Sequence, residues 1–328
     1  PLKKSSLPYS SGRLPAPSSK VPPMTAPTPR PASGLPYALG TYVFWGLFPL
    51  YFAALRHVPA FEMVGWRIVF TLPFCAVLVL WRRNVGAVLA ALRNPRTLGI
   101  LAASSLFIGA NWTIYVWAVQ SGHVLAASLG YYINPLLNVL AGTLFLKERL
   151  SRLQWGAVAL AALGVAILAF NALTMLWVSL GLSLSFCCYG LLRKRVAVEA
   201  LPGLAVESLF LLIPGIAIVT NQALSPAGSS LGQSLTTDAL LALAGVFTGL
   251  PLLLFAIAAR RMDYSTLGFV QFVTPTLVFL LGVFVFREEV RTTQIVCFAF
   301  IWSAIVLFSL DLLRRRKRTR AGVRPKAA

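Results

Sequence analysis

The apolar residues of this 328-residue chain fall into consecutive blocks, each close to the roughly 20 residues that an α-helix needs to cross the hydrocarbon layer of a membrane. Apolar residues make up 58% of the chain and charged residues only 12%, about half the charged share that is usual in a soluble domain. A soluble protein of this length needs a charged exterior, and these charges are too few and too clustered to form one. We therefore expect an all-α integral membrane protein.

The apolar blocks predict ten membrane-spanning helices. Trp and Tyr recur near their ends, for example at Tyr37, Trp81 and Trp155, and such rings prefer the headgroup layer. The longest expected loop, 221–238, is rich in Gly, Pro and Ser. The predicted spans are 36–55, 60–81, 97–120, 125–146, 151–171, 174–192, 203–220, 239–260, 264–286 and 292–312.

Positive charge is distributed unevenly over the predicted loops. The formal net charge is +20, and all but four of the 29 Lys and Arg residues lie on the side that holds both termini. The exceptions are Arg67 within a span and Arg56, Arg287 and Arg291 in loops of the other side. Because cytoplasmic loops are enriched in Lys and Arg, we expect a multi-pass protein of the cell (inner) membrane with both termini in the cytoplasm.

The two ends of the chain differ from the spans. Residues 1–34 are rich in Pro and Ser and hold no apolar run, a composition typical of a disordered tail; within them, Met24 is a candidate translation start. Residues 313–328 form a basic tail, which we expect to contact anionic lipid headgroups rather than nucleic acid. The four cysteines lie in apolar blocks without metal-ligand spacing, so no metal or cofactor is expected.

The two halves of the chain, 36–171 and 174–312, repeat one another. A shift of 140 residues superposes several residues in the same order, and each half holds five predicted spans. Because five is odd, the second copy would enter the membrane upside down, as in the inverted repeats of many secondary transporters. The superposed pairs include Pro135 and Pro275, Gly142 and Gly282, Glu148 and Glu288, and Gln154 and Gln294.

Several segments carry a resemblance to a known family. The most specific is 127–136, which reads ASLGYYINPL; the others are 110–112, 145–149, 185–191, 197–200, 265–269, Gln271 and Pro275. Over about residues 36–312 the chain resembles the EamA-domain family of the drug/metabolite transporter (DMT) superfamily. The resemblance implies a ten-span permease built from two EamA repeats. One departure is Trp66, which stands before Arg67 where the resemblance implies His.

Ionisable residues inside the predicted spans are functional candidates, because a charge at membrane depth is costly. Glu207, near the start of the seventh span, is either a substrate contact or proton carrier, or an interfacial carboxylate that faces water. Arg67, about seven residues into the second span, either holds an anionic group of the substrate or forms a structural ion pair with Glu207 or Glu62.

Polar residues beside two prolines predict a central cavity. Pro135 and Pro275 remove backbone donors and are expected to interrupt or kink their helices, and freed carbonyls at membrane depth are tolerated beside protein or a water-filled cavity. The alternative is a packing kink with internally bonded amides. Gly130 and Gly268 are expected to allow close helix approach. The expected cavity residues are Asn111, Trp112, Tyr131, Asn134, Gln271 and Thr274.

These features predict a secondary transporter, not an enzyme, that moves a small metabolite or drug-like compound by alternating access. No nucleotide-binding motif is present, so transport driven by ATP is not expected. Export is the expected direction and protons are a candidate coupling ion; the substrate and the oligomeric state stay open. The alternatives are an intramembrane enzyme acting on an apolar or lipid-linked substrate, and a non-transporting sensor or scaffold.

Overall fold

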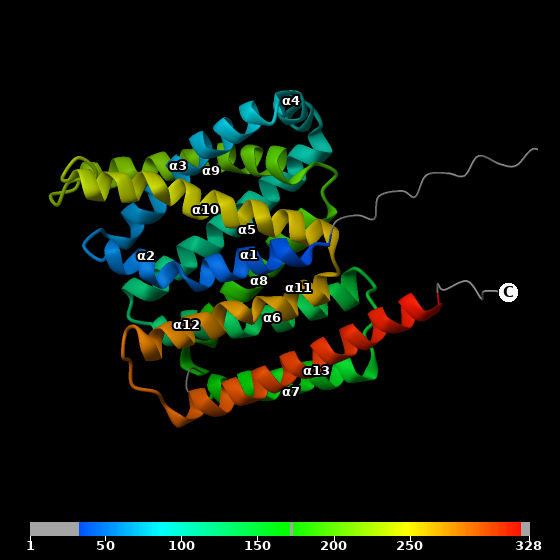
Figure 1. Cartoon of the computed structure of the whole chain (residues 1–328). Coiled ribbons are helices and arrows are strands. Elements are labelled where there is room, and N and C mark those ends of the chain that lie inside the picture. Colours follow the sequence, from blue (N-terminus) through cyan, green and yellow to red (C-terminus); the bar gives the residue numbers. More distant parts are fainter. Residues whose placement is uncertain (1–32, 171–172, 323–328) are drawn as a thin grey trace, which may run out of the picture. The chain divides into compact units, whose positions relative to one another are not determined.

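The computed structural model describes residues 33–170 and 173–322. Within these residues, all regular structure is helical (Figure 1). The helices are α1 (Leu35–Gly46), α2 (Phe48–Ala54), α3 (Ala60–Trp81), α4 (Val85–Arg93), α5 (Pro95–Gln120), α6 (Val124–Phe145), α7 (Arg152–Ala169), the short 3-10 helix η1 (Leu173–Met175), α8 (Leu176–Arg195), α9 (Ala200–Ala223), α10 (Leu235–Arg261), α11 (Tyr264–Gln271), α12 (Val273–Phe284) and α13 (Thr292–Gly322).

Nine stretches of the described chain are long and apolar enough to cross a membrane. They match nine of the expected spans, and α11 and α12 together form one of them. The chain is therefore a multi-pass, all-α membrane protein. The first expected span, 36–55, consists of α1 and α2, which have 12 and 7 residues and meet at Leu47. Since neither is long enough to span alone, the count of ten stays a prediction.

Three details differ from the expectations. Between the second and third spans the chain forms an additional helix, α4, which packs on α9 through Ala91. With nine residues, α4 is too short to cross a membrane. Helix α6 continues through Pro135 without interruption. The expected interruption near Pro275 is present, but it lies at Phe272, where α11 ends and α12 begins.

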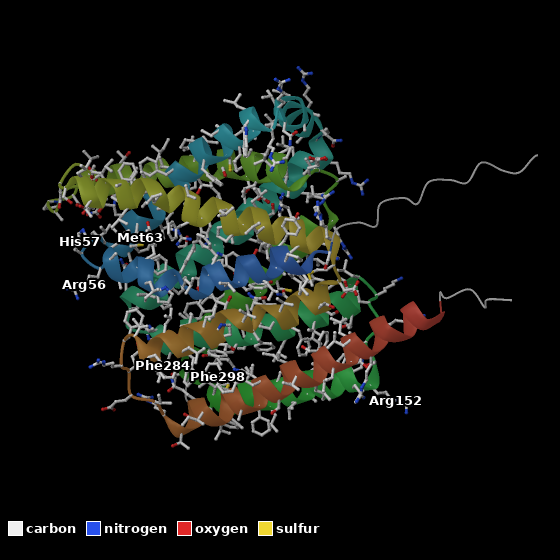
Figure 2. All side chains as sticks on the ribbon, in the orientation of Figure 1. Arg56, His57, Met63, Arg152, Phe284 and Phe298 are labelled. Carbon is white, nitrogen blue, oxygen red and sulfur yellow. The ribbon has the colours of Figure 1, made fainter. Side chains whose placement is uncertain are left out.

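The helix ends lie at two faces. We call the face that holds the ends of α3, α6, α8 and α10 the basic face, because most described Lys and Arg residues outside helix interiors lie there, and the other the opposite face. In Figure 2, Arg152 lies toward the basic face, whereas Arg56 and Phe284 lie toward the opposite face. Of the expected tails, residues 1–32 and 323–328 lie outside the described residues, and α13 extends the last span to Gly322.

Helices from the two halves pack against one another in matched pairs. Helix α3 packs on α9, α6 on α11, and α7 on α13. Each pair joins a helix of the first half to its counterpart in the second half. A two-fold axis that relates the two halves would bring such counterparts together. The ends of α6 and α12 also share an unusual backbone: Lys147 and Arg287 both have positive φ, 57° and 55°. These matches support the predicted repeat.

Candidate functional site

A cavity of about 240 Å³ lies between the two halves. Its walls come from α1, α2, α3, α5 and α6 of the first half and from α8, α10, α11 and α12 of the second. Val124, the first residue of α6, is 49% exposed and lines the end of the cavity that lies toward the opposite face. Toward the basic face, the fully buried rings of Tyr42, Tyr189 and Tyr264 fill the space between the helices. The cavity is therefore closed on the basic side.

Arg67 is the single charged residue among the described residues that line the cavity. It lies seven residues along α3, about 10 Å from the start of that helix at 1.5 Å per residue. Its Nε donates a hydrogen bond to Thr248 Oγ1 at 2.9 Å. Its guanidinium lies 5.3 Å from the ring centre of Trp112 and 5.8 Å from that of Phe48. Aromatic faces attract a cation, but they do not neutralise it.

The expected ion pair of Arg67 is not present. Among the described residues, no carboxylate lies within ion-pair distance of its guanidinium. Glu62 and Glu207, the two partners that the sequence suggested, are both bonded elsewhere. The other hypothesis, a guanidinium available to a substrate, therefore gains support from the geometry.

All six polar and aromatic residues expected at the cavity line it. They are Asn111, Trp112, Tyr131, Asn134, Gln271 and Thr274. Two of them use their hydrogen bonds for packing: Asn111 Nδ2 donates to Leu182 O at 2.7 Å, and Thr274 Oγ1 donates to Tyr42 O at 2.9 Å. The other residues leave polar atoms available.

Asn134 and Gln271 form the polar floor of the cavity. Gln271 Oε1 accepts a hydrogen bond from Asn138 Nδ2 at 2.7 Å, which joins α11 to α6. Asn134 Oδ1 is buried and has no hydrogen-bond partner among the described residues. An unpaired buried carbonyl is costly; the residue lines the cavity, but this oxygen is covered by its neighbours in the present conformation.

The predicted packing residues lie where helices meet. A Cβ on Gly268 would stand 2.7 Å from Pro135 O, and one on Gly130 would stand 3.2 Å from Ser179 O. Both glycines therefore allow helices to approach closely. Pro275 and Gly130 also contribute to the cavity wall, whereas Pro135 is buried inside α6.

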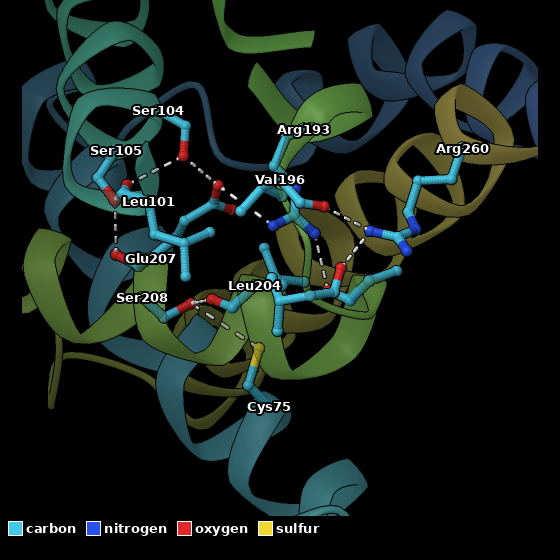
Figure 3. A network of polar contacts seen from close by, with 12 residues as sticks. Cys75, Leu101, Ser104, Ser105, Arg193, Val196, Leu204, Glu207, Ser208 and Arg260 are labelled. Carbon is cyan, nitrogen blue, oxygen red and sulfur yellow. Dashed lines mark hydrogen bonds and ion pairs between the residues drawn. The ribbon is translucent and has the colours of Figure 1, made fainter. Parts of the chain in front are cut away.

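Glu207 belongs to a different cluster (Figure 3). Its carboxylate accepts a hydrogen bond from Ser104 Oγ, and its Oε1 lies 3.5 Å from Arg193 Nη1. Arg193 also donates to Ala200 O at 2.8 Å. Glu207 and Arg193 are 1% and 0% exposed, so the predicted interfacial carboxylate facing water is wrong. Glu207 does not line the cavity; it borders a separate, much smaller pocket, and Trp112 lines both.

Glu62 binds the loop between α9 and α10. Its carboxylate accepts hydrogen bonds from Ser229 Oγ, from Ser230 N and Oγ, each at 2.7 Å, and from Trp66 Nε1 at 3.1 Å. Trp66, which replaces the implied His, is thus a donor in a structural contact. This placement gives Glu62 a role in holding the loop and places it outside the cavity wall.

Sequence analysis did not single out Arg193 or Thr248. Arg193 was one of three consecutive basic residues at a span end, a pattern that reads as a topology signal, and nothing in the sequence separates it from Lys194 and Arg195. A Cβ on Gly203 would meet the Arg193 guanidinium, so the space for this side chain depends on a glycine in the next helix. That dependence is visible only in three dimensions.

The comparisons with known proteins agree with the fold. Residues 32–170 match the EamA-like transporter family. An "Uncharacterized transporter" of Pseudomonas aeruginosa is 46% identical over 86% of this chain and 95% of its own length. "Protein RarD" of Escherichia coli is 40% identical over 87% of this chain and 97% of its own length. The chain belongs to the EamA-like transporter family, and it resembles the RarD proteins within it.

Two further similarities agree with this assignment. An "Uncharacterized transporter" of Bacillus subtilis is 39% identical over 88% of this chain and 97% of its own length. A solved crystal structure, 20% identical in sequence, superposes with a TM-score of 0.67 over 86% of this chain and 99% of its own. The second similarity bears on the fold alone.

Proposed function

We propose that this protein is a secondary transporter that moves a small molecule across the cell membrane by alternating access. The cavity between the two halves carries this proposal, because it is open toward one face and closed by packed aromatic rings toward the other. Two halves of opposite orientation would exchange these conformations around a site near the midplane. The membership in a transporter family supports the proposal.

The cavity gives less support to an intramembrane enzyme. Such an enzyme needs carboxylates or a nucleophile that face each other at a substrate. In the described part of the chain, Glu62 and Glu207 lie in separate bonded clusters, and neither lines the cavity. No observation favours this alternative.

A flux assay tests the proposal. Inside-out vesicles that contain the protein are incubated with a cytosolic metabolite extract, with and without a proton gradient, and the accumulated compounds are identified by mass spectrometry. We expect at least one compound to accumulate only in vesicles with the protein, and we expect the gradient to increase its level. Accumulation in inside-out vesicles would establish export, and accumulation in right-side-out vesicles would establish import.

A pair of matched substitutions separates transport through the cavity from leakage. Ser128 is exposed and lines the cavity, whereas Ser303 is exposed on α13, away from it. Ser128→Trp should abolish the flux because the indole fills the cavity, and Ser303→Trp should leave it unchanged. Equal flux in the two variants would contradict transport through this cavity. The absence of accumulation with wild type in both vesicle orientations would contradict the function itself.

A further inference from the structure

The cavity also carries information about its substrate. Arg67 places one positive charge in a wall that is otherwise apolar, aromatic or neutral and polar, and no carboxylate compensates it among the described residues. Arg67 is half-buried, and a charge that is partly removed from water without a counterion is unfavourable, so a ligand that neutralises it gains binding energy from that contact. A cation would add repulsion, and a dianion would leave one negative charge uncompensated.

The surroundings of Arg67 define the rest of the ligand. Nε is used by Thr248, so the two terminal nitrogens of the guanidinium remain for a ligand, and their fork matches a carboxylate. The rings of Trp112, Phe48 and Phe52 stand within 5.9 Å of the guanidinium. These rings, with Trp45 and Phe186 further along the wall, offer flat apolar surface to an organic body.

We propose that the substrate is an amphipathic organic monoanion, with one carboxylate or similar group on an aromatic or aliphatic body. The anionic group binds the terminal nitrogens of Arg67, and the body lies against the aromatic wall. This assignment rests on the proposed transport function and adds the charge and polarity of the cargo.

The test compares charge classes rather than single compounds. The flux assay is repeated with wild type, Arg67→Gln and Arg67→Lys, and the accumulated compounds are sorted by their charge at pH 7. We expect the compounds carried by wild type to be monoanions, and their flux to fall about 30-fold or more in Arg67→Gln, since a hydrogen bond to a charged group contributes about 2–3 kcal/mol. Arg67→Lys should retain part of the flux because it keeps the charge.

The outcomes separate the substrate class from the transport function. Carriage of cations or neutral compounds by wild type, or equal carriage of anions by wild type and Arg67→Gln, would overturn the substrate class and leave transport standing. No flux of any compound in wild type would overturn transport. The thermal stability of each variant, measured in detergent, shows that lost flux is not lost folding.

A different observation carries a second inference, about how the two faces alternate. At the basic face, the Glu148 carboxylate accepts hydrogen bonds from Tyr264 N at 2.7 Å and from Ser265 N at 2.8 Å, so it caps the first turn of α11. A Cβ on Gly142 would stand 2.6 Å from Ser265 Oγ. The end of α6 and the start of α11 are therefore in direct contact, and the carboxylate holds them together.

The corresponding residues at the opposite face lack this contact. Glu288, the counterpart of Glu148, follows the same backbone turn: its N–H bonds to Gly282 O at 2.9 Å, as that of Glu148 bonds to Gly142 O at 3.0 Å. However, the Glu288 side chain is exposed and has no hydrogen-bond or ion-pair partner among the described residues. A Cβ on Gly282 would meet only the carboxylate of Glu288.

Helix α6 starts where Glu288 would be expected to bind. A shift of 140 residues takes Tyr264, the first residue of α11, to Val124, the first residue of α6. The first turn of α6 has no side-chain cap, and capping by an acidic side chain stabilises a helix N-terminus. Val124 and Val278 line the cavity between these two ends. The uncapped start of α6 and the unpartnered carboxylate thus both lie toward the opposite face.

We infer that the two carboxylates act as alternate latches. When the cavity opens to the basic face, Glu148 releases α11, and Glu288 caps α6 and closes the opposite face. The contacts are inferred to alternate because Glu148 is bonded to the first turn of α11 while Glu288 has no partner among the described residues in the same conformation. The proposal predicts that removing either carboxylate shifts the equilibrium between the conformation open to the basic face and the one open to the opposite face. The two removals should shift it in opposite directions.

Cysteine labelling measures this equilibrium without a substrate. In the full-length protein, with its four native cysteines replaced by alanine, reporters are placed at Val278, on the opposite side, or at Ala141, which is buried on the basic side. A membrane-impermeant maleimide is added on the side of the opposite face for the reporter at position 278 and on the side of the basic face for the reporter at position 141, and its reaction rate is followed. Glu148→Gln should raise labelling at position 141 and lower it at position 278; Glu288→Gln should do the reverse. The expected change is about threefold to tenfold, since each latch contributes about 1 kcal/mol.

Glu289→Gln is the matched control, because Glu289 is an exposed carboxylate next to Glu288 without a counterpart latch. It should leave both labelling rates unchanged. Shifts of the same sign for Glu148→Gln and Glu288→Gln, or a Glu288→Gln protein that behaves like Glu289→Gln, would overturn the exchange. Since labelling needs no cargo, this result is independent of the flux assay.

Discussion

Two arginines lie among the helices of this protein, and their surroundings differ in one respect. Arg193 is fully buried, and it bonds to the carbonyl of Ala200 and pairs with Glu207. Arg67 lies seven residues into α3, bonds to a neutral hydroxyl and faces aromatic rings. Among the described residues, it has no acidic partner.

The difference separates a structural charge from one that is available to a ligand. A buried charge with its counterion holds two helices together and leaves no charge to bind anything else. A charge that stands alone at a cavity wall destabilises the empty state and stabilises a state with an anion bound. In our proposal, the same residue type serves folding in one half of the protein and recognition in the other.

The largest expected effect is a loss of stability when the structural arginine, Arg193, is replaced. Arg193→Leu leaves Glu207 buried without its partner and should lower the free energy of unfolding by about 3–5 kcal/mol. The double variant Arg193→Leu, Glu207→Leu should recover much of this loss, because no isolated charge remains. Unfolding in detergent, followed by circular dichroism, measures both. Arg82→Leu, at an exposed position, is the control, and equal stability of Arg193→Leu and Arg82→Leu would contradict the assignment.

Replacement of Arg67 should have the converse effect: transport is lost and stability is kept. Arg67→Gln should leave the free energy of unfolding within about 1 kcal/mol of wild type, because no acidic partner is stranded. Its transport of an anionic compound should fall roughly 30-fold or more in kcat/KM. Initial rates and melting curves on one preparation give both values. A large loss of stability together with the loss of transport would make Arg67 a structural residue like Arg193.

A smaller effect tests how Arg67 is oriented. Thr248→Val removes the hydroxyl that accepts from Nε and keeps the shape of the side chain. The guanidinium loses its orientation but keeps its charge, so KM should rise about threefold to tenfold with little change in kcat. Thr113→Val, which removes an exposed hydroxyl bonded within its own helix, is the comparison. A change in kcat alone would place Thr248 in the conformational step instead.

The smallest effect concerns Glu62, which the sequence offered as a partner for Arg67. Glu62→Gln should leave the transport rate within about twofold of wild type. The loop that Glu62 holds through Ser229 and Ser230 should open more often, because a neutral amide is a weaker acceptor than a carboxylate. Hydrogen exchange at residues 225–234 should rise by about tenfold. A transport defect comparable to that of Arg67→Gln would mean that the two side chains interact in another conformer.

The sequence was sufficient for nine of the ten expected spans, because membrane helices are selected by length and polarity alone. The bounds of α3 and α6, for example, agree with the predicted 60–81 and 125–146 to within one residue. The cavity residues were also predictable, since polar side chains beside a proline in an apolar span have few other places to lie. Helix α4 was missed because nine residues give too short a pattern.

The pairing of charges depended on the tertiary structure. Glu207 and Arg67 are both isolated charges in apolar segments, and nothing in their local sequence distinguishes a paired from an unpaired group. Pairing depends on which turns of which helices come into contact, and the residues adjacent to either group in the chain do not specify this. The sequence by itself therefore determined a multi-pass helical protein with a polar cavity. Only the tertiary structure, which brings the end of α8 beside the first turns of α9, decided that Glu207 pairs with Arg193 and that Arg67 has no acidic partner among the described residues.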